Sequence, residues 1–353
     1  MTSKKYIAVT LSALYLFIVI NLALWHSTVK TAFMRGDLSR MAVIATPKSL
    51  TEAKHYTQHH TELADYIASG KRESFDVLTL GDSFSSGEYQ DYLVNQYGLK
   101  IMNARVRESC LNEMYTLLDY GIIDEIKPRV IIIEIVERGV QGQLGRSEFV
   151  RKNLPEVPRE KMAAPKPANI GKSISSGILP PVMVLGNFRF VRSKIRYRLH
   201  PNRSSGGAYI TKLDRELFSN PGYEDVLFHF YEDLNYLQET LNPEMLNQNL
   251  NTAARVLKAK GIKLIFFAAA DKYDLYYPYI LDKQGRPENT LFQKLRELQD
   301  KEYTYIDTMK ILRQELDRGE KDIYWQDDTH WSSKGIKIFC DELVKYILPE
   351  IKH

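Results

Sequence analysis

The sequence predicts an α/β protein with a doubly wound parallel sheet of about five strands, helices on both faces, and one transmembrane helix at the N-terminus. Short apolar runs alternate with segments of helical periodicity through much of residues 73–353, which is the pattern of parallel strands joined by helices. An uncharged apolar stretch precedes them at residues 6–25. The chain has 353 residues, 44% of them hydrophobic and 26% charged, so we expect a large folded core.

The apolar stretch at residues 6–25 is long enough to span a bilayer as a helix. Lys4 and Lys5 precede it, and the positive-inside rule then predicts a cytoplasmic N-terminus with the rest of the chain on the other side. A cleaved signal peptide is the alternative, but its apolar region would be unusually long and no clear small-x-small cleavage site follows. We therefore expect an uncleaved single-pass anchor in the inner (cytoplasmic) membrane and a folded domain on the periplasmic or extracellular side.

Three parts of the chain are expected. Residues 1–30 hold a cytoplasmic tip and the anchor, residues 31–72 read as a polar, partly helical stalk, and residues 73–353 form the α/β domain. A long insertion at about residues 141–225 interrupts that domain, because this segment is rich in Pro, Gly, Ser and basic residues and shows no clear period. We expect the insertion to lie outside the sheet and to contain short helices.

The elements of the α/β domain follow from their apolar patterns. The predicted strands are short apolar runs at residues 75–80, 100–104, 129–136, 263–268 and 303–306. The predicted helices have apolar residues three or four positions apart, at residues 88–97, 111–126, 233–260, 290–301, 309–318 and 332–348. The run Val-Ile-Ile-Ile within residues 129–136 is typical of a parallel strand that is buried on both faces.

Two short motifs contain the parts of a nucleophilic site. Ser83 lies in a Gly-Asp-Ser turn directly after the first predicted strand, and His330 lies in an Asp-Asp-Thr-His-Trp segment before the last predicted helix. A serine hydroxyl needs a neighbouring base to act as a nucleophile, and a histidine base needs a carboxylate on its other ring nitrogen. Asp328 and Asp327 both precede His330 closely enough to fill that role, and we favour Asp328. An ordinary turn serine and a helix-capping histidine are the alternative.

Further polar residues follow other predicted strands. Arg138 comes after the third strand and Lys272 after the fourth, and the carboxyl ends of parallel strands are where such sheets bind ligands. We expect both side chains to face the cleft with Ser83, although ion pairs with Glu137 and Asp271 would be an alternative. Trp331 next to His330 predicts either a packed wall or a surface on which a sugar stacks.

These motifs resemble a known family. The order, with Gly-Asp-Ser first and Asp-x-x-His last, resembles the SGNH (GDSL-type) hydrolase superfamily, and the Asp-x-His-Trp motif at residues 328–331 resembles its polysaccharide branch, which includes the alginate O-acetyltransferases. The segment at residues 270–278, with Lys272 and Tyr273, and the strand end at residues 134–138 are also similar to that branch. The resemblance covers roughly residues 75–140 and 230–350.

The resemblance implies an SGNH-like fold and a membrane-anchored O-acetyltransferase that modifies a cell-surface or secreted polysaccharide. In such an enzyme Ser83 would carry the acetyl group, His330 would act as base and Asp328 would orient it. Arg138, Lys272, Tyr273 and Trp331 would bind the substrate or the oxyanion. A multi-pass membrane-bound O-acyltransferase would supply the acyl group, so no cofactor and no metal are expected.

The sequence departs from the superfamily in two places. The glycine of the second block, an oxyanion donor, has no counterpart in residues 103–109, and the Gly-x-Asn-Asp of the third block is absent. Arg138 could replace these donors, or it could bind an acidic sugar. Two other functions therefore stay open: an esterase that deacetylates a glycan, and a catalytically silent assembly or glycan-binding component.

Charge and cysteine content add little. The formal net charge of +4 is too small to indicate a nucleic-acid partner by itself. The two cysteines, Cys110 and Cys340, fit no metal-ligand spacing. They are expected to be either two buried free thiols or a single disulfide.

Overall fold

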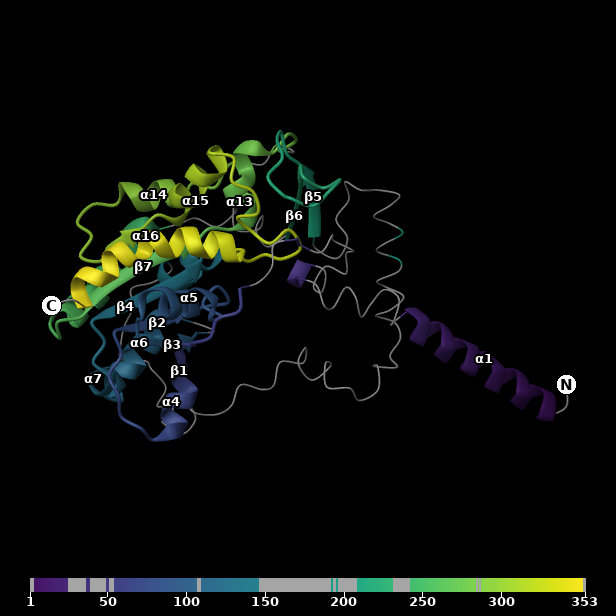
Figure 1. The fold of residues 1–353 in the computed structure, drawn as a ribbon, viewed down its shortest axis with the longest axis horizontal. Helices are drawn as coiled ribbons and strands as arrows, with labels where there is room; N and C mark the ends of the chain where they lie inside the picture. The colour runs from purple at the N-terminus through teal and green to yellow at the C-terminus, as the bar shows by residue number, and fades with distance from the viewer. Residues whose placement is uncertain are drawn as a thin grey trace.

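The structure is a computed structural model that describes residues 3–24, 36–38, 49–50, 54–106, 109–145, 192, 195, 208–230, 242–283, 285 and 287–351. Its main feature is a six-stranded sheet in the order β1-β3-β2-β4-β7-β8 (Figure 1). All neighbouring strands of this sheet are parallel. The strands are β1 (Thr61–Glu62), β2 (Val77–Gly81), β3 (Ile101–Arg105), β4 (Val130–Val136), β7 (Lys263–Ala269) and β8 (Thr304–Ile306). The predicted doubly wound parallel sheet is therefore confirmed.

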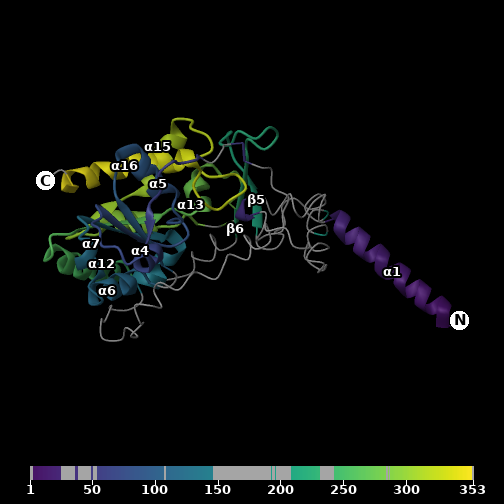
Figure 2. The same cartoon turned by 60° about the horizontal axis from the view of Figure 1, so that its bottom comes forward.

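Helices cover both faces of the sheet, as Figure 2 shows. One face carries α5 (Glu88–Tyr97), α15 (Thr308–Asp317) and α16 (Ser333–Ile351). The other carries α6 (Cys110–Asp119), α7 (Ile122–Ile126) and α12 (Pro243–Lys258). The remaining short helices are α4 (Leu63–Ser69), α13 (Lys272–Tyr276) and α14 (Leu291–Glu297), with single turns at Glu137–Gly139, Gln141–Gly145 and Tyr277–Tyr279. Because both faces are covered, β2 and β4 are buried along their whole length.

The local sequence explains several helix boundaries. Asn242 caps α12 by accepting a hydrogen bond from the Met245 N–H, and Pro243 follows it at the first helical position. Residues 111–126, predicted as one helix, form α6 and α7, because Gly121 adopts φ +69° between them. At the start of α16, a Cβ on Gly335 would lie 2.3 Å from the Ile323 carbonyl oxygen. Glycine at this position lets α16 approach the loop that precedes it.

The strand order places a topological switch point beside β2. From β2 the chain crosses to β3 on one side and later returns to β4 on the other. Ligands of open α/β sheets bind beyond the carboxyl ends of the strands at such a point. The Gly-Asp-Ser turn follows β2, Arg138 follows β4 and Lys272 follows β7, so the fold brings these residues to one edge of the sheet.

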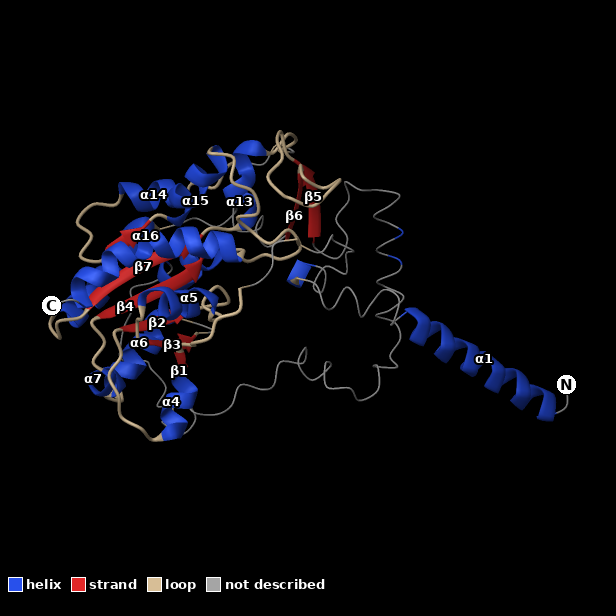
Figure 3. Cartoon of the chain, viewed as in Figure 1, coloured by secondary structure: helices blue, strands red, loops and turns tan. Residues whose placement is uncertain are grey.

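A second, two-stranded antiparallel sheet lies apart from the first (Figure 3). It consists of β5 (Ala208–Lys212) and β6 (Val226–Phe230). Val226, Phe228 and Phe230 form a small apolar cluster with Leu38, which lies far away in the sequence. The predicted insertion at about residues 141–225 is thus outside the main sheet where it is described, but it contributes a hairpin strand that we did not predict. Most of residues 146–207 lie outside the described part of the chain.

The segment predicted as a stalk differs from the prediction. Within residues 31–72, β1 pairs with β3 and becomes an edge strand of the main sheet, and Leu63 and Tyr66 of α4 pack into the core. The α/β domain therefore begins before residue 73. A two-residue strand carries too short a pattern to be recognised in the sequence, because alternation needs at least four residues to show.

At the N-terminus, α1 (Ser3–Leu24) is the one helix of the described residues that is long and apolar enough to cross a membrane. Its apolar side chains are largely exposed, including Tyr6, Leu14 and Tyr15, which agrees with a segment that contacts lipid rather than a protein core. Cys110 and Cys340 are both buried free thiols.

Candidate active site

The Gly-Asp-Ser turn is held against β4 by two carboxyl groups. The Asp82 carboxylate accepts hydrogen bonds from the backbone N–H groups of Phe84 (3.1 Å) and Val136 (2.7 Å). The buried Glu134 side chain accepts one from the Asp82 N–H (3.0 Å) and one from the Ser85 hydroxyl (2.9 Å). Burial and the nearby Asp82 carboxylate raise the pKa of Glu134 well above its ordinary value. Both ends of the turn are therefore fixed.

The turn also requires glycine at its first position. A Cβ on Gly81 would lie 2.0 Å from the Ser85 hydroxyl oxygen and 2.4 Å from Glu134 Oε2. No side chain fits at that distance, so Gly81 makes room for the hydrogen bonds that shape the turn. Ser83, at its tip, is half-buried.

The His330 loop lies directly against this turn. The Phe84 ring, one residue after Ser83, lies 4.8 Å from the His330 ring and 5.3 Å from the Trp331 ring, measured between centroids. The residue that follows Ser83 thus packs against the His330 ring, although the two motifs are far apart in the sequence.

His330 is oriented by Asp328. Asp328 Oδ1 lies 2.6 Å from His330 Nδ1 and also accepts the His330 backbone N–H at 3.0 Å. An ionised carboxylate only accepts hydrogen bonds, so Nδ1 carries the proton. The other ring nitrogen, Nε2, is buried and has no hydrogen-bond partner among the described residues. This is the arrangement in which Nε2 can exchange a proton with a nucleophile.

The two aspartates that precede His330 have different partners. The Asp327 carboxylate accepts a hydrogen bond from the Gly36 N–H at 3.1 Å, whereas that of Asp328 binds the imidazole. A further carboxylate, that of Asp37, lies 3.4 Å from His330 Nδ1. The sequence offered no signal for Asp37, because it is 293 positions before His330 and belongs to no recognisable motif.

The protonation of His330 and Asp328 depends on the balance between burial and neighbouring charges. Burial disfavours the imidazolium, but the hydrogen bonds with Asp328 and Asp37 outweigh it and raise the pKa of His330 to about 10. Burial likewise opposes ionisation of Asp328, yet its hydrogen bond with His330 lowers the pKa of that carboxyl group. The mutual contact of His330 and Asp328 therefore favours the imidazolium and the ionised Asp328 carboxylate over their neutral forms.

Lys272 holds the backbone of the His330 loop through its ammonium group. Its ammonium group is buried and donates to the backbone carbonyls of Trp325 (2.6 Å), Gln326 (3.0 Å) and Asp328 (3.0 Å). An ammonium group has three protons, and these three acceptors match them. Lys272 therefore binds the backbone of the His330 loop, and its predicted contact with substrate stays a prediction.

The other predicted substrate residues have mixed placements. Trp331 is 2% exposed, packs against Phe267 and Phe339, and donates from Nε1 to the Tyr324 hydroxyl at 2.6 Å. Of the two alternatives for Trp331, a packed wall or a surface on which a sugar stacks, the structure shows the packed wall. Tyr273 is also buried, with its ring 4.8 Å from that of His229. Neither side chain offers a surface to the acceptor in this structure.

The Arg138 guanidinium forms an ion pair with Asp271, and the Arg138 backbone N–H donates a hydrogen bond to the same carboxylate at 3.1 Å. The guanidinium side chain remains 21% exposed whereas Asp271 is 1% exposed. The pair therefore joins the ends of β4 and β7, with the arginine on the solvent side. Of the four predicted binding residues, Arg138 is the one cation that remains partly exposed near the strand ends.

Two groups of side chains in the described residues bring three potential metal-ligand atoms within 4.8 Å of one another. They are Asp37, Asp328 and His330, and Glu137, Asp271 and Asp274. In the first group the carboxylates accept hydrogen bonds from His330, Thr329 and the Asp37 N–H. In the second, Asp271 binds Arg138, and burial and the adjacent Asp274 raise the pKa of Glu137 well above its ordinary value. Both groups are hydrogen-bonded as they stand.

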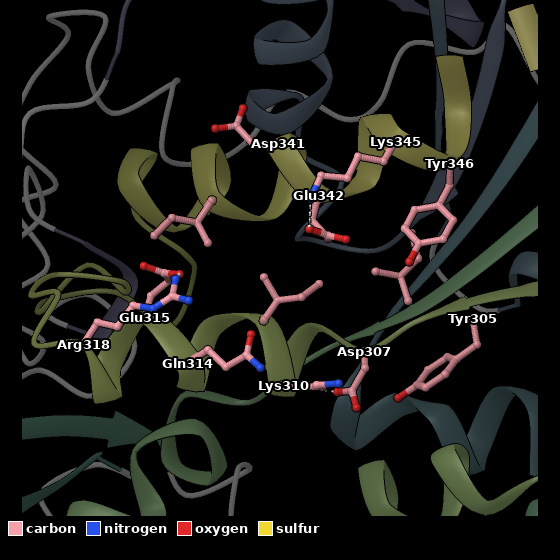
Figure 4. Close-up of a pocket in the computed structure, with 13 residues that line it drawn as sticks. Tyr305, Asp307, Lys310, Gln314, Glu315, Arg318, Asp341, Glu342, Lys345 and Tyr346 are labelled. Carbon is pink, nitrogen blue, oxygen red and sulfur yellow. Dashed lines mark hydrogen bonds and ion pairs between the residues drawn. The ribbon is translucent and has the colours of Figure 1, made fainter. Parts of the chain in front are cut away.

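A separate groove of about 640 Å³ lies between α15 and α16 (Figure 4). None of the residues that line it belongs to the Ser83 turn or the His330 loop. Two ion pairs lie within its lining, Lys345 with Glu342 and Arg318 with Glu315. The groove therefore reads as a solvated surface between two helices and not as part of the site.

A comparison with protein families matches the C-terminal part of the chain. Residues 221–350 match the family model described as the SGNH hydrolase-like domain of acetyltransferase AlgX. The match includes β7, Lys272 and the His330 loop, whereas Ser83 precedes it. It confirms the predicted resemblance to the SGNH superfamily and its alginate O-acetyltransferase-like branch, and the fold is that of an SGNH-like domain. No curated protein matched the chain.

Proposed function

We propose that the protein is a membrane-anchored, extracytoplasmic O-acetyltransferase that transfers acetyl groups to hydroxyls of a cell-surface or secreted polysaccharide. The observation that carries this proposal is the geometry of His330, with Nδ1 on Asp328 and Nε2 buried without a partner beside the Ser83 turn. The family match to an acetyltransferase domain supplies the reaction class. The apolar helix α1 supports anchoring in the inner membrane.

The first half of the reaction forms an acetyl-enzyme. The Ser83 hydroxyl oxygen attacks the carbonyl carbon of the donor ester or thioester while its proton passes to His330 Nε2. The tetrahedral intermediate collapses, the bond to the leaving group breaks, and that group takes the proton from His330. Asp328 holds the ring in the required tautomer throughout. A multi-pass membrane-bound O-acyltransferase is the proposed donor of the acetyl group.

The second half transfers the acetyl group. A sugar hydroxyl gives its proton to His330 Nε2 and attacks the acetyl-serine, and Ser83 then regains a proton as the ester bond breaks. The negative charge on the carbonyl oxygen needs hydrogen-bond donors in both halves. The Ser83 backbone N–H, which has no acceptor among the described residues, is the donor that the turn offers, and the partly exposed Arg138 guanidinium is a second candidate.

The proposal is tested with the full-length protein in detergent micelles, a small acetyl ester as donor, and acetyl-free polysaccharide as acceptor. We expect acetate to appear on the polysaccharide in the wild-type reaction and not with Ser83→Ala. Release of free acetate alone, at a rate that the acceptor does not change, would instead indicate an esterase. No reaction with any ester would favour the silent component.

A further inference from the structure

A short segment next to the membrane anchor contacts the catalytic loop. Eleven residues separate Gly36 from the end of α1, and each of residues 36–38 donates its backbone N–H to the loop. Gly36 donates to the Asp327 carboxylate (3.1 Å), Asp37 to the Asp328 carboxylate (2.8 Å), and Leu38 to the Asp327 carbonyl oxygen (3.2 Å). Three consecutive backbone N–H groups thus bind acceptors on two adjacent loop residues, which makes a specific interface.

The fit of this segment depends on its side chains. A Cβ on Gly36 would lie 2.2 Å from the Asp327 carbonyl oxygen and 2.8 Å from the Asp328 Cβ, so no other residue can approach the loop as closely. Leu38 is fully buried against Val226, Phe228 and Phe230, and Figures 1 and 2 show the segment beside β6. The segment thus combines Gly36, where a side chain would clash with the loop, and Leu38, whose side chain packs into the apolar cluster of β6.

Asp37, between them, binds the residue that precedes the catalytic histidine. Its carboxylate accepts hydrogen bonds from the Thr329 backbone N–H (2.8 Å) and from the Thr329 hydroxyl. Asp37 and Thr329 are both buried, so these bonds are protected from water. The same carboxylate lies 3.4 Å from His330 Nδ1, which places a second negative charge beside the imidazole.

The charged groups that face His330 come from several elements. Asp328 belongs to its own loop, Asp37 to the membrane-proximal segment, and Glu88 to the first turn of α5. Glu88 accepts the Ser333 hydroxyl at 2.6 Å and interacts with His330 only electrostatically. The Lys272 ammonium faces the loop carbonyls on the other side. Asp37 is thus the second-nearest carboxylate to the ring, after Asp328.

We propose that residues 36–38 dock onto the His330 loop as part of the active site, and that Asp37 is a positioning residue that fixes Thr329 and places a second carboxyl group beside the His330 ring. The role of His330 as the catalytic base rests on the proposed function. Because a chain spans at most about 3.5 Å per residue, the twelve steps from Leu24 to Gly36 keep the catalytic loop within about 40 Å of the end of α1. The anchor therefore tethers the site close to the membrane surface.

The experiment measures the titration of His330 in the full-length protein in detergent micelles, by nuclear magnetic resonance of labelled histidine. The resonance of His330 is the one that His330→Gln removes. We expect Asp37→Asn to lower the pKa of His330 by about one unit or more, because an opposite charge at this distance stabilises the imidazolium. The control Asp124→Asn, which removes only an exposed ion pair with Lys260, should leave the titration unchanged.

Two outcomes would overturn the inference. One is an unchanged His330 titration in a folded Asp37→Asn protein. The other needs no variant: in hydrogen exchange of the wild-type protein, the amides of residues 36–38 should exchange slowly, and exchange as fast as in an unstructured peptide would show that the segment does not dock. A shifted titration in a protein without any acetyl-transfer activity would keep this inference and reject the proposed function.

Discussion

The Asp37 carboxylate binds both the backbone N–H and the hydroxyl of Thr329. Thr329 directly precedes His330, so this contact fixes the main chain that carries the imidazole. Lys272 holds the same loop through three of its carbonyl groups, and Phe84 packs against the ring. The histidine is therefore positioned by three segments that are distant from one another in the sequence.

The first prediction concerns Ser83 and His330 as one catalytic unit. Ser83→Ala and His330→Ala should each lower kcat for acetyl-ester turnover by at least about 10³-fold, and the double variant should be little slower than either, because both residues act in the same steps. Steady-state kinetics of the three variants provide the test. Losses that multiply in the double variant would show that the residues act independently.

The second prediction separates the two neighbouring aspartates. Asp328→Asn should lower kcat by about 10⁴-fold, because an amide no longer holds the Nδ1–H tautomer. Asp327→Asn should cost less than about tenfold, since its amide oxygen can still accept the Gly36 N–H. A larger loss from Asp327→Asn, with both proteins folded, would assign the orienting role to Asp327.

The third prediction concerns Lys272. Lys272→Met should destabilise the protein by about 2–4 kcal/mol, because three buried carbonyl groups lose their donor. Thermal unfolding measures the loss, and Lys258→Met, at an exposed helix position, should stay within about 0.5 kcal/mol of the wild type. If Lys272→Met unfolded like the wild type but raised the KM for the acceptor, Lys272 would bind substrate after all.

The fourth prediction concerns the glycine that opens the serine turn. Gly81→Ala should cost about 1–3 kcal/mol of stability, because its methyl group would overlap Ser85 and Glu134. It should also lower kcat, since those side chains shape the turn that carries Ser83. Gly142→Ala is the matched control, because no atom lies within 4 Å of the added methyl group. Equal behaviour of the two variants would contradict this account of the turn.

The fifth prediction concerns pH. A general base must be neutral, and the pKa of His330 is raised from 6.5 to about 10, so kcat/KM for an acetyl ester should still rise with pH in the alkaline range. Stability should change in the opposite direction. The contribution of His330 is fully present below pH 6.5 and is lost as pH rises through about 10. A rate that reaches its plateau near pH 7 would mean that the free enzyme holds a neutral His330.

The sequence predicted the elements with strong patterns. The five predicted strands all occur, because each is a compact apolar run bounded by polar or turn residues. The Ser83 turn and the His330 loop were also found, since each is a short contiguous motif. The rule that carboxyl ends of parallel strands share one edge correctly placed the Ser83 turn, Arg138 and Lys272 at one edge of the sheet.

Other features depend on contacts that no local pattern records. The segment at residues 36–38 contacts a loop about 290 positions away, and a lone aspartate gives no sign of such a partner. The sequence placed Lys272 at the correct edge of the sheet. It could not predict that the Lys272 side chain points to the His330 loop, because a side chain at a strand end can point in more than one direction. The sequence left two roles for Trp331, a packed wall or a platform for a sugar. Its burial in the structure supports the packed wall.

The most direct test of the central claim is the detection of an acetyl-enzyme. Full-length protein is mixed with an activated acetyl ester, quenched in acid within the first turnover, digested, and analysed by mass spectrometry. The account predicts one acetyl group on the peptide that contains Ser83, located on Ser83 itself, and none on that peptide in His330→Ala. Acetyl transfer that proceeds without modification of Ser83, or a stable acetyl group on a different residue that reacts onward to the acceptor, would contradict it.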